Sequence, residues 1–153
     1  MARRKTWAPV PALKPGKTTA YKLLNHVCKL ILEEPRRYNQ GQWLLNFRYY
    51  ANPTEAQAQL HRKKRIPDCG TIGCVAGWVT TLGDPKDLLP SLSIESKARS
   101  ILGIDYGQGL DLFAPTAVRG VAGSLVHARS GVKHIRQFMR ANKTQLQQKT
   151  VEV

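Results

Sequence analysis

The segment 67–78, PDCGTIGCVAGW, holds two cysteines, and a cysteine thiol can act as a nucleophile or as a metal ligand. If a helix begins at Cys74, its dipole favours the thiolate, as in cysteine hydrolases whose nucleophile stands at a helix N-terminus. His127 and His134, further along the chain, are the candidate bases. One cysteine with histidines at no set spacing is a weak constellation, so catalysis by Cys74 is an alternative hypothesis only.

Metal binding is a second chemical alternative for the same segment. Structural zinc takes four ligands, usually in pairs two to four residues apart, and four residues separate Cys69 from Cys74. His61, or Cys28 together with His26, would have to complete the set. Because Cys28 falls within a predicted helix, a core position is its simpler interpretation. We therefore expect no cofactor, with zinc held by Cys69, Cys74 and His61 as the alternative.

A packing role explains the segment best. In a helix that starts at Cys74, the small side chains of Cys74, Gly77 and Thr81 share one face, and a second helix can approach them closely. Trp78 supplies a large apolar side chain beside that face. We interpret Cys69, Cys74, Gly77 and Trp78 as a structural motif.

Capping residues and apolar spacing predict short helices around this motif. Thr18 or Thr19 caps a helix whose apolar face continues to Pro35, which ends it. A break at Ser130–Gly131 is expected to separate the last two helices. Further helices are predicted over residues 53–64, 73–82, 94–102, 118–125 and 132–139.

The glycine-rich segment 102–113, LGIDYGQGLDLF, matches neither a calcium loop nor a phosphate loop. We expect it to be a turn that returns Leu110, Leu112 and Phe113 to the core. The aromatic segment 42–51, QWLLNFRYYA, suits a buried strand or a helix equally well.

The predicted fold class is all-α, because the 153 residues suffice for one core and the patterns are helical. We expect a single-domain helical bundle over residues 18–141, with a flexible basic arm at 1–17 and a frayed polar tail at 142–153. No stretch approaches the roughly 20 apolar residues that span a bilayer, and prolines interrupt the N-terminus where a signal peptide needs an apolar run. Three cysteines leave one unpaired in any disulfide scheme, which favours a reducing cytoplasm.

Charge is unevenly distributed along a chain whose net charge is +14. Residues 1–65 carry 14 Lys and Arg against three acidic residues, a net charge of +11. Residues 66–115 carry three basic and six acidic residues, a net charge of −3. Residues 116–153 carry seven basic residues and one acidic residue, a net charge of +6. The cysteine motif therefore lies in the acidic middle, and the basic flanks are expected to bind an anionic partner on other surfaces.

Three basic stretches are the candidate nucleic-acid contacts. The arm is flexible enough to follow a phosphate backbone, segment 36–50 mixes arginines with aromatic rings that could stack on bases, and HRKKR at 61–65 concentrates charge. No known reading module is present, so binding should show little sequence preference. The candidate residues are Arg3, Arg4, Lys5, Lys14, Lys17, Arg36, Arg37, Tyr38, Arg48, Arg62, Lys63, Lys64 and Arg65.

The order ILEEPRRYNQGQW, CGTIGCVAGW, ARSILGIDYGQGLDLF and GVKHIRQFM resembles small uncharacterised proteins of bacteria and their phages that share a C-x-T-x-x-C-x-A-G-W core. The likeness covers roughly residues 30–139 and is most specific at the cysteine motif. It implies a compact helical domain and, if the gene belongs to a phage, a place in the cytoplasm of the bacterial host. It implies no activity, and this sequence departs from the pattern in its basic arm and in HRKKR.

The sequence thus favours a non-enzymatic accessory or modulator protein that binds nucleic acid, RNA or DNA, or a nucleoprotein complex. One alternative is a protein-interaction module that docks on an acidic protein partner through the same basic surfaces. The second alternative is the cysteine hydrolase that uses Cys74. The oligomeric state and the target are not specified by these patterns.

Overall fold

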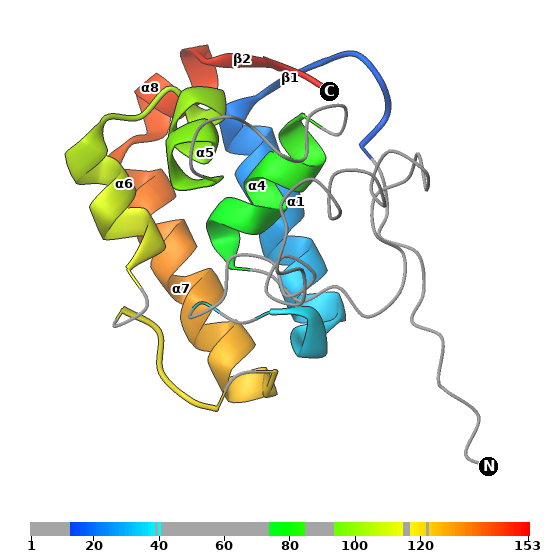
Figure 1. Ribbon diagram of the computed structural model, residues 1–153, viewed down its shortest axis with the longest axis vertical. Coiled ribbons are helices and arrows are strands. Elements are labelled where there is room, and N and C mark those ends of the chain that lie inside the picture. Colours follow the sequence, from blue (N-terminus) through cyan, green and yellow to red (C-terminus); the bar gives the residue numbers. More distant parts are fainter. Residues whose placement is uncertain (1–12, 39, 41–73, 85–93, 115–116, 122) are drawn as a thin grey trace, which may run out of the picture.

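The computed structural model (Figure 1) describes residues 13–38, 40, 74–84, 94–114, 117–121 and 123–153. The described residues form six α-helices, one 3-10 helix and a two-stranded sheet, which confirms the helical fold class. The elements are β1 (Lys17–Thr19), α1 (Ala20–Glu33), η1 (Pro35–Arg37), α4 (Val75–Gly83), α5 (Ile94–Leu102), α6 (Tyr106–Phe113), α7 (Leu125–Ala141), α8 (Lys143–Gln148) and β2 (Thr150–Glu152).

Helix α1 forms as its sequence predicts. The hydroxyl oxygen of Thr19 accepts a hydrogen bond from the amide of Lys22 at 3.3 Å and so caps the first turn. Apolar residues recur on one face and are buried, and the helix ends just before Pro35. The buried residues of α1 are Ala20, Leu23, Leu24, Val27, Cys28, Leu30 and Ile31.

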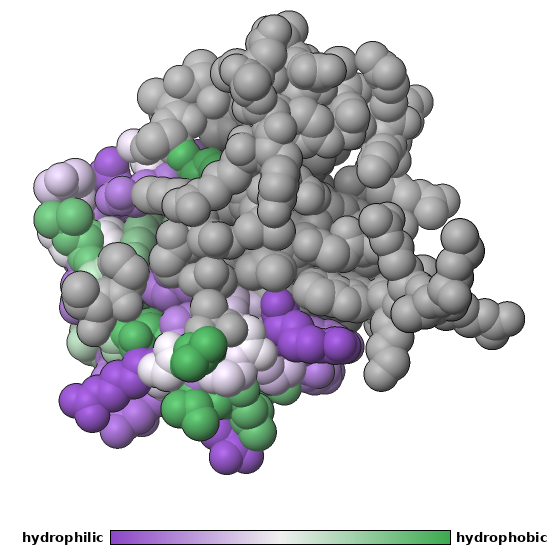
Figure 2. All heavy atoms as spheres, turned by 60° about the horizontal axis from the view of Figure 1, so that its bottom comes forward, coloured by the Kyte–Doolittle hydropathy of each residue, from purple (hydrophilic) through white to green (hydrophobic). Residues whose placement is uncertain are grey.

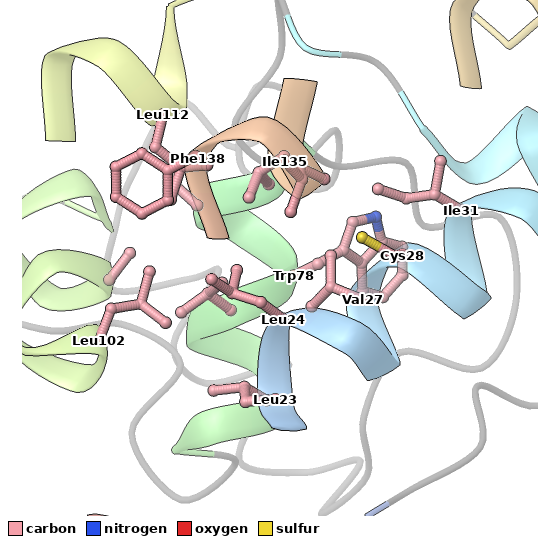
Figure 3. Packing of buried hydrophobic residues seen from close by; sticks show 14 of the residues in the cluster. Leu23, Leu24, Val27, Cys28, Ile31, Trp78, Leu102, Leu112, Ile135 and Phe138 are labelled. Atoms are coloured by element: carbon pink, nitrogen blue, oxygen red, sulfur yellow. The ribbon is translucent and has the colours of Figure 1, made fainter. Parts of the chain in front are cut away.

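Helix α4 is the centre of the core, because all nine of its residues are buried. It contacts both α1 and α5. Figure 3 shows the indole of Trp78 beside Val27, Cys28 and Ile31 of α1. A helix that is buried all round belongs to a core rather than to a surface, and this explains the apolar run in VAGWVTTLG.

Residues 102–113 are not the simple turn that their glycines suggested. Of the glycines in this segment only Gly103 has a positive φ, 65°, at the turn, and α6 begins three residues later at Tyr106. Asp105 and Gln108 form a reciprocal capping box, which satisfies the first amides of the helix. Leu112 and Phe113 are buried as expected, whereas Leu110 is 50% exposed, so its predicted return to the core is wrong.

Helix α7 is one continuous helix of 17 residues, so the predicted break at Ser130–Gly131 is wrong. Gly131 is buried, and the ring of Tyr38 occupies the space that a Cβ atom would need. The glycine therefore serves a close contact within the helix and does not end it. The helix predicted over 118–125 is also absent among its described residues, where α7 begins only at Leu125.

The C-terminal residues are not frayed, which corrects the prediction for 142–153. They form α8 and β2, and they bury Leu146 completely and Val151 almost completely. Strand β2 pairs antiparallel with β1 in the register Lys17 with Glu152 and Thr19 with Thr150. The last residue of the predicted arm is thereby part of the sheet.

In Figure 1, α1 and α7 run side by side in opposite directions, and α4 lies in front of α1. The small sheet closes the end at which α1 begins. Across the described residues, no helix has the length and apolar character needed to cross a membrane.

Candidate nucleic-acid interface

Helix α7 carries four exposed cations on one face. Arg129, Lys133, Arg136 and Arg140 follow the spacing i, i+4, i+7, i+11, and each side chain is exposed. At 3.6 residues per turn this spacing aligns them in a single row along the helix. We refer to these four residues as the cationic row.

No acidic residue offsets the row within its own helix, because LVHARSGVKHIRQFMRA contains neither Asp nor Glu. None of the four cations forms an ion pair with a carboxylate of the described residues. Glu33 and Glu34, at the end of neighbouring α1, lie instead within 3.7 Å of Lys29 and 3.6 Å of Arg36, respectively. A helix face that is merely solvated usually mixes both signs of charge, so this row is a candidate anion-binding surface.

The opposite face of α7 is anchored in the core, which fixes the direction of the row. The hydroxyl oxygen of Ser124 accepts a hydrogen bond from the amide of His127 at 3.1 Å and caps the helix. The anchoring residues are His127, Ala128, Gly131, Val132, Ile135, Phe138 and Met139, all of them buried.

A buried polar network holds the first half of α7. The hydroxyl of Tyr38 donates to the side-chain oxygen of Gln40 at 3.0 Å. The backbone N–H of Gln40 donates to Nε2 of His127 at 3.2 Å. Since Nε2 accepts, the ring is the Nδ1–H tautomer, and Nδ1 lies 3.2 Å from the carbonyls of Arg119 and Gly120. The network ties the end of η1, the loop before α7 and the first turn of α7 together.

A shallow groove of about 460 Å³ runs beside the row, between α7 and α1. Leu32 and Val132 form its apolar part, and all four cations line it. The positive charge of Arg136 also reaches α1, where it partly opposes the burial that raises the pKa of Cys28 to about 11. The row thus borders a surface hollow that could receive part of a bound chain.

Exposed apolar side chains gather where α7 begins. Val121, Leu125 and Val126 are 80%, 45% and 65% exposed, and Leu125 precedes Arg129 by one turn. Figure 2, which looks at this end of the molecule, shows apolar surface next to strongly hydrophilic side chains. Leu125, four residues before Arg129, therefore extends the face of the cationic row with an apolar side chain.

The basic residues singled out from the sequence fall into three groups. Lys14, Lys17 and Arg36 are exposed, and Lys17 lies 3.9 Å from Glu152 across the sheet. Arg37 lies in η1. Arg3, Arg4, Lys5, Arg48, Arg62, Lys63, Lys64 and Arg65 lie outside the described residues.

Tyr38 is not available for base stacking, so its predicted role is wrong. Its side chain is completely buried against Gly131 and lies 5.0 Å from the ring of His127, centroid to centroid. Burial raises the pKa of its hydroxyl, which stays protonated and donates to Gln40. Its function is to position α7.

The structure does not support a nucleophilic role for Cys74. The thiol caps α4, where its sulfur accepts a hydrogen bond from the amide of Gly77 at 3.5 Å, but the side chain is buried. Burial raises the pKa of Cys74 to about 11, so the thiolate is scarce at neutral pH. The candidate bases have other partners, since His127 belongs to the buried network and Nε2 of His134 lies 2.8 Å from the carbonyl oxygen of Asp111.

Metal binding finds no support in the described part of the chain, where no group of three or more His, Cys, Asp or Glu side chains is placed to hold an ion. Cys69 and His61, the other proposed zinc ligands, lie outside it. Within the motif, Cys74, Gly77 and Trp78 are buried, and the hydroxyl of Thr81 donates to the carbonyl of Gly77 at 2.8 Å. A close helix contact at Gly77 remains a prediction.

Comparisons with protein-family models, with curated proteins and with solved structures gave no match.

The cationic row was missed at the sequence level because the expected break at Gly131 placed Arg129 in a different helix from the other three cations. The available signal was the spacing 129, 133, 136, 140 in a stretch without acidic residues.

Proposed function

We propose that this protein binds nucleic acid, alone or within a nucleoprotein complex, as a non-enzymatic accessory protein, and that the cationic row of α7 is a central part of the binding surface. The observation that carries this proposal is the alignment of Arg129, Lys133, Arg136 and Arg140 on a helix without acidic residues. Cations that neutralise phosphates release condensed counterions, and this release drives binding without any base readout.

The surface is larger than the row. Lys14, Lys17 and Arg36 are exposed, and the basic segments at 3–5 and 61–65 add charge to a chain with a net charge of +14. Several phosphate contacts of this kind give roughly micromolar affinity with weak sequence preference. We propose a cytoplasmic setting, in the bacterial host if the gene belongs to a phage, because the cysteine content suits a reducing compartment.

A second candidate is docking on an acidic protein. The exposed apolar patch of Val121, Leu125 and Val126 favours it, because apolar surface next to cations is typical of protein interfaces. Such a partner would use Arg129 and its neighbours but would leave nucleic acid unbound.

The test is a fluorescence polarisation titration of nuclease-treated protein with labelled DNA and RNA oligonucleotides at low and physiological salt. The variant Lys133→Gln with Arg136→Gln should lose at least about tenfold in affinity, because two phosphate contacts are removed. The matched control is Lys22→Gln with Lys143→Gln, which removes the same charge from exposed positions outside the row and should lose less.

Equal losses in the two double variants would refute the assignment of the row. No binding by the native protein at low salt would refute the nucleic-acid proposal. In that case, binding of a labelled poly-glutamate peptide would support the acidic-protein alternative.

A further inference from the structure

We infer that the cationic row selects double-stranded nucleic acid and lies along its phosphates, a step that rests on the proposed function. Three properties of the described structure lead to this inference: the length of the row, the fixed helix backbone that carries it, and the absence of an exposed Phe, Tyr or Trp side chain on α7.

Along the length of the row, a duplex presents more phosphate charges than a single strand does. Eleven residues separate Arg129 from Arg140, which is about 16 Å of helix at 1.5 Å per residue. Over that distance a B-form duplex presents about ten phosphate charges, whereas one strand of the same rise presents about five. A linear array of four cations therefore meets about twice the charge density on a duplex.

The helix backbone that carries the row is fixed before binding. Helix α7 is held by the contact between Tyr38 and Gly131 and by the hydrogen bond from Gln40 to His127. A duplex is also rigid, so binding orders the four side chains of the row but neither backbone. A flexible single strand must be ordered along the row, and this ordering costs free energy that the duplex avoids.

Base stacking, the usual compensation for binding a single strand, has no platform on α7. Phe138 and His127 are buried, and the third ring of the helix, the partly exposed imidazole of His134, lies outside the row with its Nε2 2.8 Å from the carbonyl oxygen of Asp111. Among the described residues, the large exposed aromatic side chain is Tyr106 on α6, and the guanidinium of Arg99 lies 5.3 Å from the centroid of its ring. Stacking contributes about 1–3 kcal/mol per base in proteins that bind single strands, and the row offers nothing equivalent.

The experiment compares a 20-base-pair DNA duplex with each of its separate strands, and the corresponding RNA duplex and strands, over a range of salt concentrations. If the row contacts four phosphates, it should contribute about −3.6 to the slope of log K against log salt for B-DNA, and about −2.8 for a single strand. Extrapolated from equal affinity at 1 M salt, the duplex should bind about sixfold more tightly at 0.1 M.

The variant with Arg129, Lys133, Arg136 and Arg140 all changed to Gln isolates the row from the other basic segments. All four side chains are exposed, so its helical circular dichroism should match that of the native protein. It should lose about 3.6 from the duplex slope and lose the preference for duplex. If it unfolds, the single variants Lys133→Gln and Arg140→Gln replace it, each with an expected change of about 0.9.

The two hypotheses fail in different ways. If the separate strands bind as tightly as the duplex or more tightly, the inference is overturned and the proposed function stands. If neither duplex nor strand binds at low salt, the proposed function itself is overturned. Binding of the duplex with an unchanged slope in the row variant would place the duplex on another surface and overturn the inference.

Discussion

Burial decides what the chemically active residues of this chain can do. Cys74 stands at a helix N-terminus, where the dipole favours a thiolate, but the desolvation of its buried sulfur has the larger effect and raises its pKa to about 11. Burial likewise raises the pKa of Cys28 to about 11. The position of Cys74 in the sequence suggested a nucleophile. Its burial keeps the thiol protonated at neutral pH.

These raised pKa values predict a loss of stability at alkaline pH. A cysteine in the unfolded chain loses its proton near its ordinary pKa of 9.0, whereas the two folded thiols keep theirs to about pH 11. Between those pH values the folded state binds more protons than the unfolded state, so the free energy of unfolding falls as pH rises. The urea midpoint should therefore decrease from about pH 8.5 to about pH 10.5.

The matched control is Cys28→Ala, which keeps a good helix former in α1 and removes one of the two titrating thiols. Its urea midpoint should decrease by less than that of the native protein over the same pH interval. An identical decrease in both proteins would show that Cys28 does not titrate as the structure implies.

At the scale of secondary structure, α7 shows how a distant contact changes the meaning of a residue. In the sequence, Gly131 suggests a helix break. In the structure it lies inside α7, where the ring of Tyr38 packs in the space that a Cβ atom would need. With the helix continuous, Arg129 joins Lys133, Arg136 and Arg140 in one row.

We expect Gly131→Ala to destabilise the fold by about 1–3 kcal/mol, because its Cβ atom would overlap the ring of Tyr38 in a packed site. For a protein of this size, each kcal/mol corresponds to a fall of about 2–4 °C in the thermal midpoint. The control is Gly107→Ala in α6, where the new Cβ atom meets only the Asp105 carboxylate at 3.4 Å. A thermal midpoint that falls equally in the two variants would contradict the contact.

The elements that the sequence predicted well are those specified by local signals. Helix α1 has its cap at Thr19, its apolar spacing and Pro35 at its end within one short segment. The C-terminal residues lack such signals, since only Leu146 and Val151 of that polar segment are buried. Their order depends on packing against α1 and on pairing with β1, at the far end of the chain.

At the scale of the whole molecule, the residues that stabilise the core and the cations of the row lie on opposite sides of α7. The core gathers α1, α4 and the buried side of α7, while the row lies on the solvent side of α7. The candidate site was predictable in its chemistry, because the net charge of +14 indicated an anionic partner. Its location was missed, because the break expected at Gly131 separated Arg129 from the other three cations, whereas α7 is continuous there.

The most direct test of the central claim is the duplex affinity of a variant that exchanges two neighbouring residues, Arg136→Gln with Gln137→Arg. Both positions are exposed on α7, and the exchange keeps composition, net charge and helix length unchanged. It moves one cation about 100° around the helix and out of the row. We expect a severalfold loss of affinity at about 0.1 M salt and a salt slope reduced by about 0.9. Native affinity with a native slope would show that only total charge matters, and would contradict the assignment of the row as the binding site.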